Sequence, residues 1–346
     1  MKLETFNDVL AAMKKNPARP FHLLLGNGFS VAYDAKIFSY NALHDFVSNL
    51  KDDDLSKIFT VIETRNFEVI MQHLDHFSAL IAAFGGDRAL KKRVDAASAK
   101  LKYSLLEAVK ALHPEHVFKV PEEQSKACAG FLKAFLKTNG ALYSTNYDLL
   151  LYWVLMRNGI VGHVDGCGRE LENDTGHPMK QEDQIWSELT WGKSRDSQNV
   201  FYLHGALQFF DSGVAVLKEE YDAYNFLLEK IAGRMKKGQY PIFVTAGDGQ
   251  QKLQHITHNQ YLTFSYDNLC RVKGSLVTFG FGFGPYDEHI IDAINRAAKQ
   301  PISDRLRSVY IGVYSENDKD HIEQIAGQFR CKVHVYDAGT ANIWGK

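Results

Sequence analysis

The sequence has few cysteines, and no two of them are spaced to form a metal-binding or redox pair. The four are Cys128, Cys167, Cys270 and Cys331, and none follows another at a C-x-x-C spacing. This distribution encodes neither a zinc ribbon nor a thioredoxin-like motif. Scattered thiols in a chain of 346 residues are instead typical of a reducing compartment.

The sequence also has no long apolar run and no excess of charge of one sign. No stretch supplies roughly 18 uninterrupted apolar residues, as a membrane span requires, and Met1–Pro20 does not resemble a secretory signal. Forty basic residues against 41 acidic ones give a net charge of −1, so the whole chain has no electrostatic attraction to nucleic acid or to an acidic membrane. We therefore expect a soluble cytoplasmic protein of ordinary globular composition.

Short apolar segments that end in glycine or a small polar residue are typical of buried parallel strands. Segments with helical spacing, such as Lys126–Lys137 and Glu288–Lys299, lie between many of them. This alternation predicts an α/β, Rossmann-like fold, with a mostly parallel open sheet and helices on both faces. The predicted strands are Phe21–Leu25, Ala141–Ser144, Val200–Leu203, Ile242–Thr245, Leu276–Phe279, Val309–Val313 and Val333–Tyr336.

Two stretches interrupt this alternation. Residues 36–125 contain no convincing strand and predict a helical insertion or subdomain, which leaves residues 1–35 and 126–346 as the Rossmann-like core. Residues 163–198 are polar and rich in Gly, Asp and Glu, which predicts a long excursion or loop. Long loops inserted in a compact sheet are usually functional or mobile.

The first motif that indicates chemistry is a glycine-containing loop after the strand Phe21–Leu25. Its glycines permit close approach of a diphosphate, and a helix that starts there directs free N–H groups at the phosphates. Glycine pairs also form ordinary strand-to-helix turns, so the motif alone is weak. The third glycine of the dehydrogenase fingerprint is missing, which disfavours a hydride-transfer enzyme of the usual type. The loop consists of Gly26, Asn27, Gly28, Phe29 and Ser30.

The second and third motifs follow two further predicted strands. Ser144-Thr145-Asn146-Tyr147-Asp148 can be a helix N-cap, although it has more cap-forming residues than one cap needs. His204-Gly205 follows Val200–Leu203, and a lone histidine there is more often structural than catalytic. Ligands of α/β proteins nevertheless bind at the carboxyl edge of the sheet, where both motifs are predicted to lie.

The fourth motif is the segment Gly280–Asp287, which follows Leu276–Phe279 and carries Gly280, Gly282 and Gly284. The segment predicts either a flexible turn or a second loop that closes over a nucleotide. Each of the four motifs is weak alone. Their occurrence at the ends of four separate strands is what indicates a binding site.

In this order the motifs resemble those of the sirtuin superfamily, particularly its bacterial sirtuin-like branch. Gly26–Ser30 resembles the G-A-G-x-S phosphate loop, and Ser144–Asp148 resembles the T-N-Y-D segment of that branch. His204-Gly205 matches the catalytic H-G pair, and Gly280–Asp287 is similar to the glycine loop with its downstream aspartate. Tyr336–Gly339, which contains Asp337, loosely matches the loop near the adenine.

The resemblance implies that NAD is a substrate rather than a redox cofactor. The zinc module of sirtuin deacylases is missing, and Val31–Lys36 replaces their G-I-P-D-F-R segment, which argues against acyl-lysine recognition. Members of the sirtuin-like branch act as NAD+ glycohydrolases in bacterial antiphage defence, often as oligomers or beside a partner protein. We expect the same here. The alternatives are an ADP-ribosyl transferase or deacylase using the same pocket, and a non-catalytic NAD or ADP-ribose sensor acting with a partner protein.

The expected roles follow from the chemistry of nicotinamide loss. Asn146 would hold the attacking water or a ribose hydroxyl, since its amide both donates and accepts. His204 would orient the ribose hydroxyls or accept a proton, and Asp148 would orient nicotinamide or brace its loop. No metal is expected, because His255 and His258 have no third ligand at a suggestive spacing. The residues expected to bind the nucleotide are Gly26, Asn27, Gly28, Phe29, Ser30, Thr145, Gly280, Gly282, Asp287 and Asp337.

Overall fold

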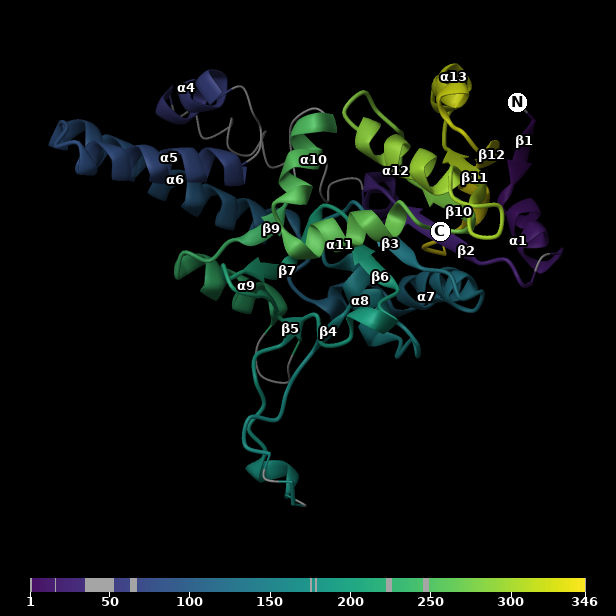
Figure 1. Cartoon of the computed structure of the whole chain (residues 1–346), viewed down its shortest axis with the longest axis horizontal. Helices are drawn as coiled ribbons and strands as arrows, with labels where there is room; N and C mark the ends of the chain where they lie inside the picture. Colours follow the sequence, from purple (N-terminus) through teal and green to yellow (C-terminus); the bar gives the residue numbers. More distant parts are fainter. Residues whose placement is uncertain are drawn as a thin grey trace.

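The protein is built around a parallel sheet. The computed structural model describes residues 2–15, 17–34, 53–62, 67–174, 176–177, 179–221, 226–244 and 249–345. Within them, a seven-stranded sheet has the order β1-β12-β11-β10-β2-β3-β6, and neighbouring strands pair in parallel (Figure 1). The strands are β1 (Leu3–Thr5), β2 (Phe21–Leu25), β3 (Leu142–Ser144), β6 (Val200–Tyr202), β10 (Gly274–Phe279), β11 (Leu306–Val313) and β12 (Lys332–Asp337). The predicted α/β, Rossmann-like fold is confirmed.

The central strands are buried along their whole length. Every residue of β2, β3, β6 and β10 is buried, because helices cover both faces of the sheet and leave no solvent-facing side to alternate with a buried one. Helices α7 and α8 lie on one face, and α11 and α12 lie on the other (Figure 1). Their bounds, with those of two further helices near the sheet, are α1 (Phe6–Lys15), α7 (Glu122–Leu136), α8 (Leu150–Arg157), α11 (Gln260–Leu269), α12 (Glu288–Ala298) and α13 (Glu316–Ile325).

A second sheet, which is antiparallel, continues from the first. It has the order β4-β5-β8-β7-β9. Strand β6 ends at Tyr202, His204 lies two residues later, and β7 begins at the next residue, Gly205. Its strands are β4 (Cys167–Gly168), β5 (Thr190–Trp191), β7 (Gly205–Asp211), β8 (Val216–Lys218) and β9 (Pro241–Phe243). The prediction that Ile242–Thr245 belongs to the parallel sheet is therefore wrong, since Ile242 lies in β9 and pairs antiparallel with Ala206.

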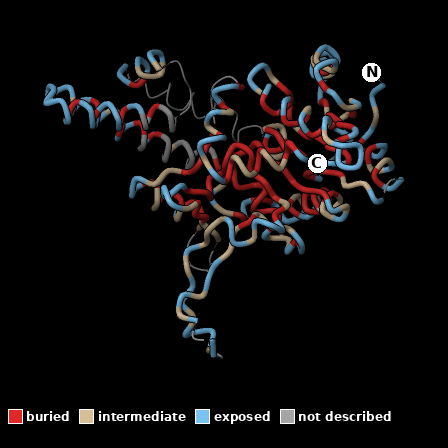
Figure 2. Tube along the Cα trace, viewed as in Figure 1, coloured by how far each residue is buried: buried red, intermediate tan, exposed pale blue. Residues whose placement is uncertain are grey.

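The polar excursion predicted at residues 163–198 contributes β4 and β5, and the chain between these strands protrudes from the molecule (Figure 1). An isolated bridge between Leu171 and Trp186 joins the two arms of this protrusion, together with hydrogen bonds from the amide of Glu172 to the carbonyl of Ile185 and from the amide of Ser187 to the carbonyl of Glu170. Short 3-10 turns, η2 (Gln181–Asp183) and η3 (Arg195–Ser197), lie within the same stretch. The excursion is thus partly anchored in the second sheet and partly exposed (Figure 2).

The described part of the stretch 36–125 consists of helices joined by short turns. It forms α4 (Asp53–Ile62), α5 (Phe67–Ala83), α6 (Arg88–Leu112) and the 3-10 turn η1 (Val117–Lys119). Residues 36–52 and 63–66 lie outside the described residues. Helices α5 and α6 pack along each other and project away from the sheets, and their distal ends are mainly exposed (Figures 1 and 2). Among the described helices, none is long and apolar enough to cross a membrane.

The remaining helical elements connect the sheets and close the chain. Helix α9 (Leu227–Lys236) packs against β7, and α10 (Gly249–Thr257) contacts α11 and α12. The 3-10 turns η4 (Ala326–Gln328) and η5 (Ala338–Ala341) follow α13 and β12. Trp344, close to the end of the chain, is buried, and its indole Nε1 donates a hydrogen bond of 2.9 Å to the carbonyl of Phe29. This contact fixes the helix that follows the glycine loop.

Two buried histidines join elements of the core in their neutral form. The Nδ1 atom of His22 accepts the amide of Ala141 at 3.0 Å, and Nε2 of His113 accepts the amide of Leu149 at 3.0 Å. Each ring donates from its other nitrogen to a backbone carbonyl. Burial lowers the pKa of each imidazole to about 4, because a charged ring would be desolvated and would lose its accepting nitrogen.

We expect the free energy of unfolding to fall as pH drops from about 6.5 towards 4. In this window the unfolded histidines bind protons that folded His22 and His113 do not, so each costs up to about 1.4 kcal/mol per pH unit, and neither contributes above pH 6.5. Urea unfolding of the wild type and His113→Gln between pH 4.5 and 7.5 tests this. The variant should show the smaller pH dependence, whereas His177→Gln, at an exposed position, should match the wild type. Equal pH dependence in all three proteins would contradict the assignment.

Candidate functional site

The four loops predicted from the motifs leave four adjacent strands at the same level of the sheet. Leu25 of β2 pairs with Phe279 of β10 on one side and with Ser144 of β3 on the other, and Ser144 pairs with Tyr202 of β6. The strand order reverses between β10 and β2. Open α/β sheets bind their ligands outside the carboxyl ends of the strands at such a reversal.

The first loop leads into α2 (Asn27–Tyr33), and three of its backbone amides donate to carbonyl groups of the protein. The N–H of Gly26 donates to the carbonyl of Phe279 at 3.0 Å, and that of Gly28 donates to the carbonyl of Gly280 at 2.8 Å. The N–H of Phe29 donates to the carbonyl of Gly26 at 2.9 Å. The expectation that these three amides point freely at a diphosphate is therefore wrong. Asn27 is the first residue of α2 and is half-buried, and its backbone amide and side chain have no hydrogen bond among the described residues.

The glycines allow the first and fourth loops to touch through their backbones. A Cβ on Gly26 would lie 2.4 Å from the carbonyl oxygen of Gly280, and one on Gly28 would lie 2.5 Å from the Gly280 Cα. Gly280 itself has φ +65°, a left-handed conformation that favours glycine. Gly282 differs, because it is exposed and a Cβ there would meet open space. The glycine pattern is thus explained first by close packing of the two loops.

Asn146 joins the second loop to the first. Its Nδ2 donates to the carbonyl of Gly26 at 2.9 Å and to Oγ of Ser30 at 3.0 Å, and its own amide donates to Oγ of Ser144 at 3.0 Å. The side chain is 8% exposed. For Oδ1 of Asn146, no hydrogen bond is recorded within the part of the chain that the structure describes, so this acceptor is the group that the residue can offer to a ligand.

Asp148 completes the connection between the two loops. Its carboxylate accepts hydrogen bonds from the hydroxyl of Ser30 and from the amide of Leu150, the latter at 2.9 Å. Burial raises the pKa of Asp148, and the bonds from Ser30 and Leu150 partly oppose that increase. The contacts favour bracing of the loop over nicotinamide binding. Thr145 is also turned inward, since its Oγ1 donates to the carbonyl of Leu25 at 3.3 Å.

His204 lies between β6 and β7 in a buried cluster. Its Nε2 is 2.9 Å from Nε2 of His289, and the two rings are stacked with centroids 5.1 Å apart. His289 is in the first turn of α12, next to Lys252 of α10 and Asp287, whose side chains form an ion pair at 3.0 Å. Oδ2 of Asp287 also accepts the amide of Gly284 at 3.2 Å. The ion pair therefore ties α10 to the fourth loop beside the histidines.

Both imidazoles in this cluster are neutral. Burial, the neighbouring His289 and the charge of Lys252 lower the pKa of His204 well below its ordinary value. Burial and then Lys252 lower the pKa of His289 to about 3. A positive ring would be desolvated and would face the ammonium group of Lys252, so neither histidine holds a second proton at neutral pH.

His289 and Lys252 were not identified from the sequence. His289 is a single histidine in an amphipathic helix, and its partner His204 lies 85 positions earlier in the chain. Lys252 lies near His255 and His258, and no sequence motif singles it out. The one local signal is that His289 comes two residues after Asp287, where the fourth loop enters α12.

Asp337 and the ring of Phe29 lie apart from the hydrogen bonds that join the four loops. Asp337 ends β12, two strands from β10, and its carboxylate accepts the amide of Gly339 at 2.8 Å. The ring of Phe29 is buried against Trp344, with centroids 5.1 Å apart, so it belongs to the core. Asp337 shares the carboxyl edge of the sheet with the four loops, but no hydrogen bond or ion pair joins its side chain to them within the described residues.

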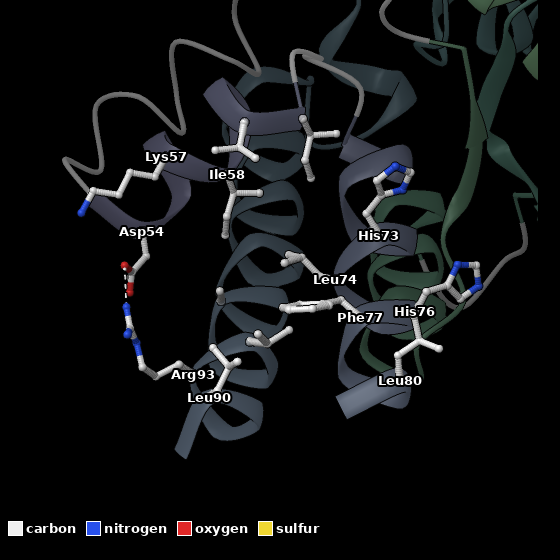
Figure 3. Close-up of a pocket in the computed structure, with 14 residues that line it drawn as sticks. Asp54, Lys57, Ile58, His73, Leu74, His76, Phe77, Leu80, Leu90 and Arg93 are labelled. Carbon is white, nitrogen blue, oxygen red and sulfur yellow. Dashed lines mark hydrogen bonds and ion pairs between the residues drawn. The ribbon is translucent and has the colours of Figure 1, made fainter. Parts of the chain in front are cut away.

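A separate hollow of about 660 Å³ lies between α4, α5 and α6 (Figure 3). Its walls are mainly apolar, and Asp54 and Arg93 form an ion pair of 3.3 Å at its rim. The residues labelled on the walls include Ile58, Leu74, Phe77, Leu80 and Leu90. No residue of the four loops lines this hollow, so it is distinct from the site at the strand ends.

The fold and the loops together define a Rossmann-like α/β protein with a polar site at the carboxyl edge of its parallel sheet. A family model described as a domain of unknown function, DUF4917, matches residues 23–344, and the chain belongs to this family. A search of curated proteins gives no match. This assignment neither supports nor contradicts the sirtuin-like resemblance, which stays a prediction.

Gly280→Ala should lower the free energy of unfolding by at least about 2 kcal/mol, because the new Cβ combines left-handed strain with overlap of the Gly28 backbone. Gly282→Ala is the matched control, two positions away in open space, and should change the free energy of unfolding by less than about 0.5 kcal/mol. Urea unfolding measures both. Equal stability of the two variants would show that the contact between the loops is not a tight constraint.

Proposed function

We propose that this protein binds NAD across the carboxyl ends of β10, β2, β3 and β6 and hydrolyses its nicotinamide–ribose bond. The observation that carries the proposal is the joining of Asn146, Gly26 and Ser30 in one hydrogen-bonded unit beside the strand-order reversal. Ser144 of β3 pairs with Tyr202 of β6. Asn146 lies two residues after Ser144, and His204 lies two residues after Tyr202, so the two residues leave neighbouring strands at the same level. The motif order of the sirtuin-like branch supplies the identity of the ligand.

The reaction converts NAD+ and water to nicotinamide, ADP-ribose and a proton. As the bond from C1′ to the nicotinamide nitrogen breaks, its electron pair stays with nicotinamide, which leaves as a neutral base, and positive charge develops on the ribose. Preorganised polar groups that hold water and sugar in place then supply the catalysis. Neutral histidines suit this step, because the two imidazoles add no positive charge of their own next to the developing oxocarbenium ion.

Asn146 is the residue we assign to the attacking water or to a ribose hydroxyl. Its Nδ2 is fixed by Gly26 and Ser30, which holds the side chain in one orientation and presents Oδ1 as an acceptor. A group whose rotamer is locked by its own hydrogen bonds loses little entropy when it binds a ligand. His204 would orient the ribose hydroxyls or accept the proton of the attacking water.

Within the first loop, we assign the contact with the diphosphate to Asn27. The amides of Gly26, Gly28 and Phe29 are already used within the protein, so these residues shape the loop and Asn27 supplies the donors. Gly280 holds the loop from the other side. The resemblance extends the proposal to antiphage defence with an oligomer or partner protein, and that role stays a prediction.

The burial of His204 favours one second candidate function. The imidazole is 0% exposed, so a ligand reaches it only if the cluster opens or if the ligand binds without direct contact. A non-catalytic sensor of NAD or ADP-ribose can bind its ligand without direct contact to His204. ADP-ribosyl transfer uses the same chemistry as hydrolysis, with another nucleophile in place of water.

Asn146→Ala should reduce nicotinamide release at least about 100-fold, because the group that positions the nucleophile is lost, and the fold should survive. Chromatography of NAD incubated with each purified protein separates nicotinamide from ADP-ribose. Asn295→Ala is the control, since Asn295 also bridges two backbone groups, those of Gln328 and Arg330, but away from the four loops. It should retain wild-type turnover.

Two results would contradict the proposal. Full activity of a folded Asn146→Ala protein would remove the residue from the mechanism. Tight binding of NAD by the wild type with no release of nicotinamide would replace the hydrolase with the sensor.

A further inference from the structure

The hollow between α4, α5 and α6 is an open apolar surface. Every described residue that lines it belongs to these three helices, and its walls include the exposed side chains of Val61, Phe77 and Leu80. Its volume of about 660 Å³ is within the range of about 300–1,000 Å³ that is usual for binding pockets. Contiguous exposed apolar surface is typical of an interaction site, so the hollow is one half of a candidate interface.

Positive charge surrounds this hollow. Lys57 of α4 and Arg93 of α6 line it, and Arg93 pairs with Asp54 at the rim (Figure 3). Helix α6 as a whole carries seven basic residues and two acidic ones. Complementary charges steer association and fix the orientation of a partner. The occupant that suits the hollow therefore combines apolar side chains with negative charge.

The protrusion between β4 and β5 has this combination of properties. Its residues 170–187 (the arm) include five acidic residues and one basic residue. Ile185 and Trp186 are neighbours in the arm and are 57% and 50% exposed, and the arm as a whole is mainly exposed (Figure 2). Tryptophan is enriched among the residues that dominate the energy of protein–protein binding. The arm is thus the second half of the candidate interface.

Hydrogen bonds hold the two apolar residues of the arm in place. Nδ2 of Asn173 donates to the carbonyl of Asp183 at 2.7 Å, and its Oδ1 accepts the amide of Ile185 at 2.9 Å. The amide of Glu172 donates to the carbonyl of Ile185 at 2.8 Å. Because the backbone beside Trp186 is ordered before it meets a partner, the arm loses less conformational entropy when it binds.

The arm of one chain does not reach the hollow of the same chain. The arm and the helices α5 and α6 project from different sides of the molecule (Figure 1). Ion pairs fix the base of the arm, where Arg169 pairs with Glu220, and Glu188 pairs with Arg234 of α9, the latter at 2.8 Å. The hollow is therefore open to the arm of another molecule.

We propose that the arm of one copy of this chain inserts Ile185 and Trp186 into the hollow of a second copy. The indole buries a large apolar area against the walls, and the acidic residues of the arm lie beside Lys57 and the basic helix α6. The two surfaces differ, so the contact is heterologous and closes when two copies exchange arms or when several form a ring. It involves none of the four loops and does not depend on the proposed reaction with NAD.

Sedimentation equilibrium of the full-length protein without NAD tests this contact. The wild type should self-associate, and Trp186→Ser and Leu80→Glu should each raise the dissociation constant at least about tenfold, because each removes one side of the contact. Two matched controls change exposed residues elsewhere. Tyr314→Ser removes an aromatic ring and Ile302→Glu introduces a charge, and both should associate as the wild type does. Circular dichroism checks the fold of each variant, and Val61→Glu, on the α4 wall, replaces Leu80→Glu if that variant is unfolded.

Mixing the two interface variants tests which surfaces meet. Trp186→Ser keeps an intact hollow and Leu80→Glu keeps an intact arm, so an equimolar mixture should associate at least about tenfold more tightly than either variant alone. A mixture no tighter than its components would overturn the proposal. Loss of association in Leu80→Glu but not in Trp186→Ser would also overturn it, because two hollows would then face each other. A monomeric wild type would overturn it as well, and the hollow would then take a small apolar ligand or another protein.

Discussion

The contact between the loops after β2 and β10 is the constraint on which the rest of the site depends. Gly26 and Gly28 lie against Gly280 with no room for a Cβ, and two amide-to-carbonyl bonds lock the pair. A Cβ on any of these glycines would overlap the backbone of the other loop, so the two loops approach each other closely through their main chains. The loops are thereby held close enough for the Gly26 carbonyl to accept the amide of Asn146, which ties β3 into the same unit.

Two buried polar systems extend outward from that contact. On one side Asn146, Ser30 and Asp148 form a network without a positive charge, so the pKa of Asp148 is raised by burial. On the other side two neutral histidines lie beside the ion pair of Lys252 and Asp287. Buried polar groups are costly unless they are satisfied by hydrogen bonds. Their concentration at one edge of the sheet is the physical reason to place function there rather than in the apolar hollow on the projecting helices.

Much of the fold could be predicted from the sequence, because apolar runs bounded by glycine mark buried strands. Whether such a strand is parallel or antiparallel could not be predicted, because both kinds bury apolar side chains. Ile242 is buried in an antiparallel strand that pairs with β7. The four loops were predicted from glycine and cap-forming residues, but not the partners of their amides, which depend on the register of β10 beside β2. His289 could not be found, because a lone histidine in a helix carries no signal until the fold brings it to His204.

Hydrogen–deuterium exchange of the whole chain, with and without NAD, tests the central claim most directly. If NAD binds where the four loops meet, amides of residues 26–30, 144–148 and 280–287 should exchange more slowly with NAD present, while the projecting helices α5 and α6 remain unchanged. Protection confined to the helical hollow, or no protection anywhere at saturating NAD, would contradict a nucleotide site at the carboxyl edge of the sheet.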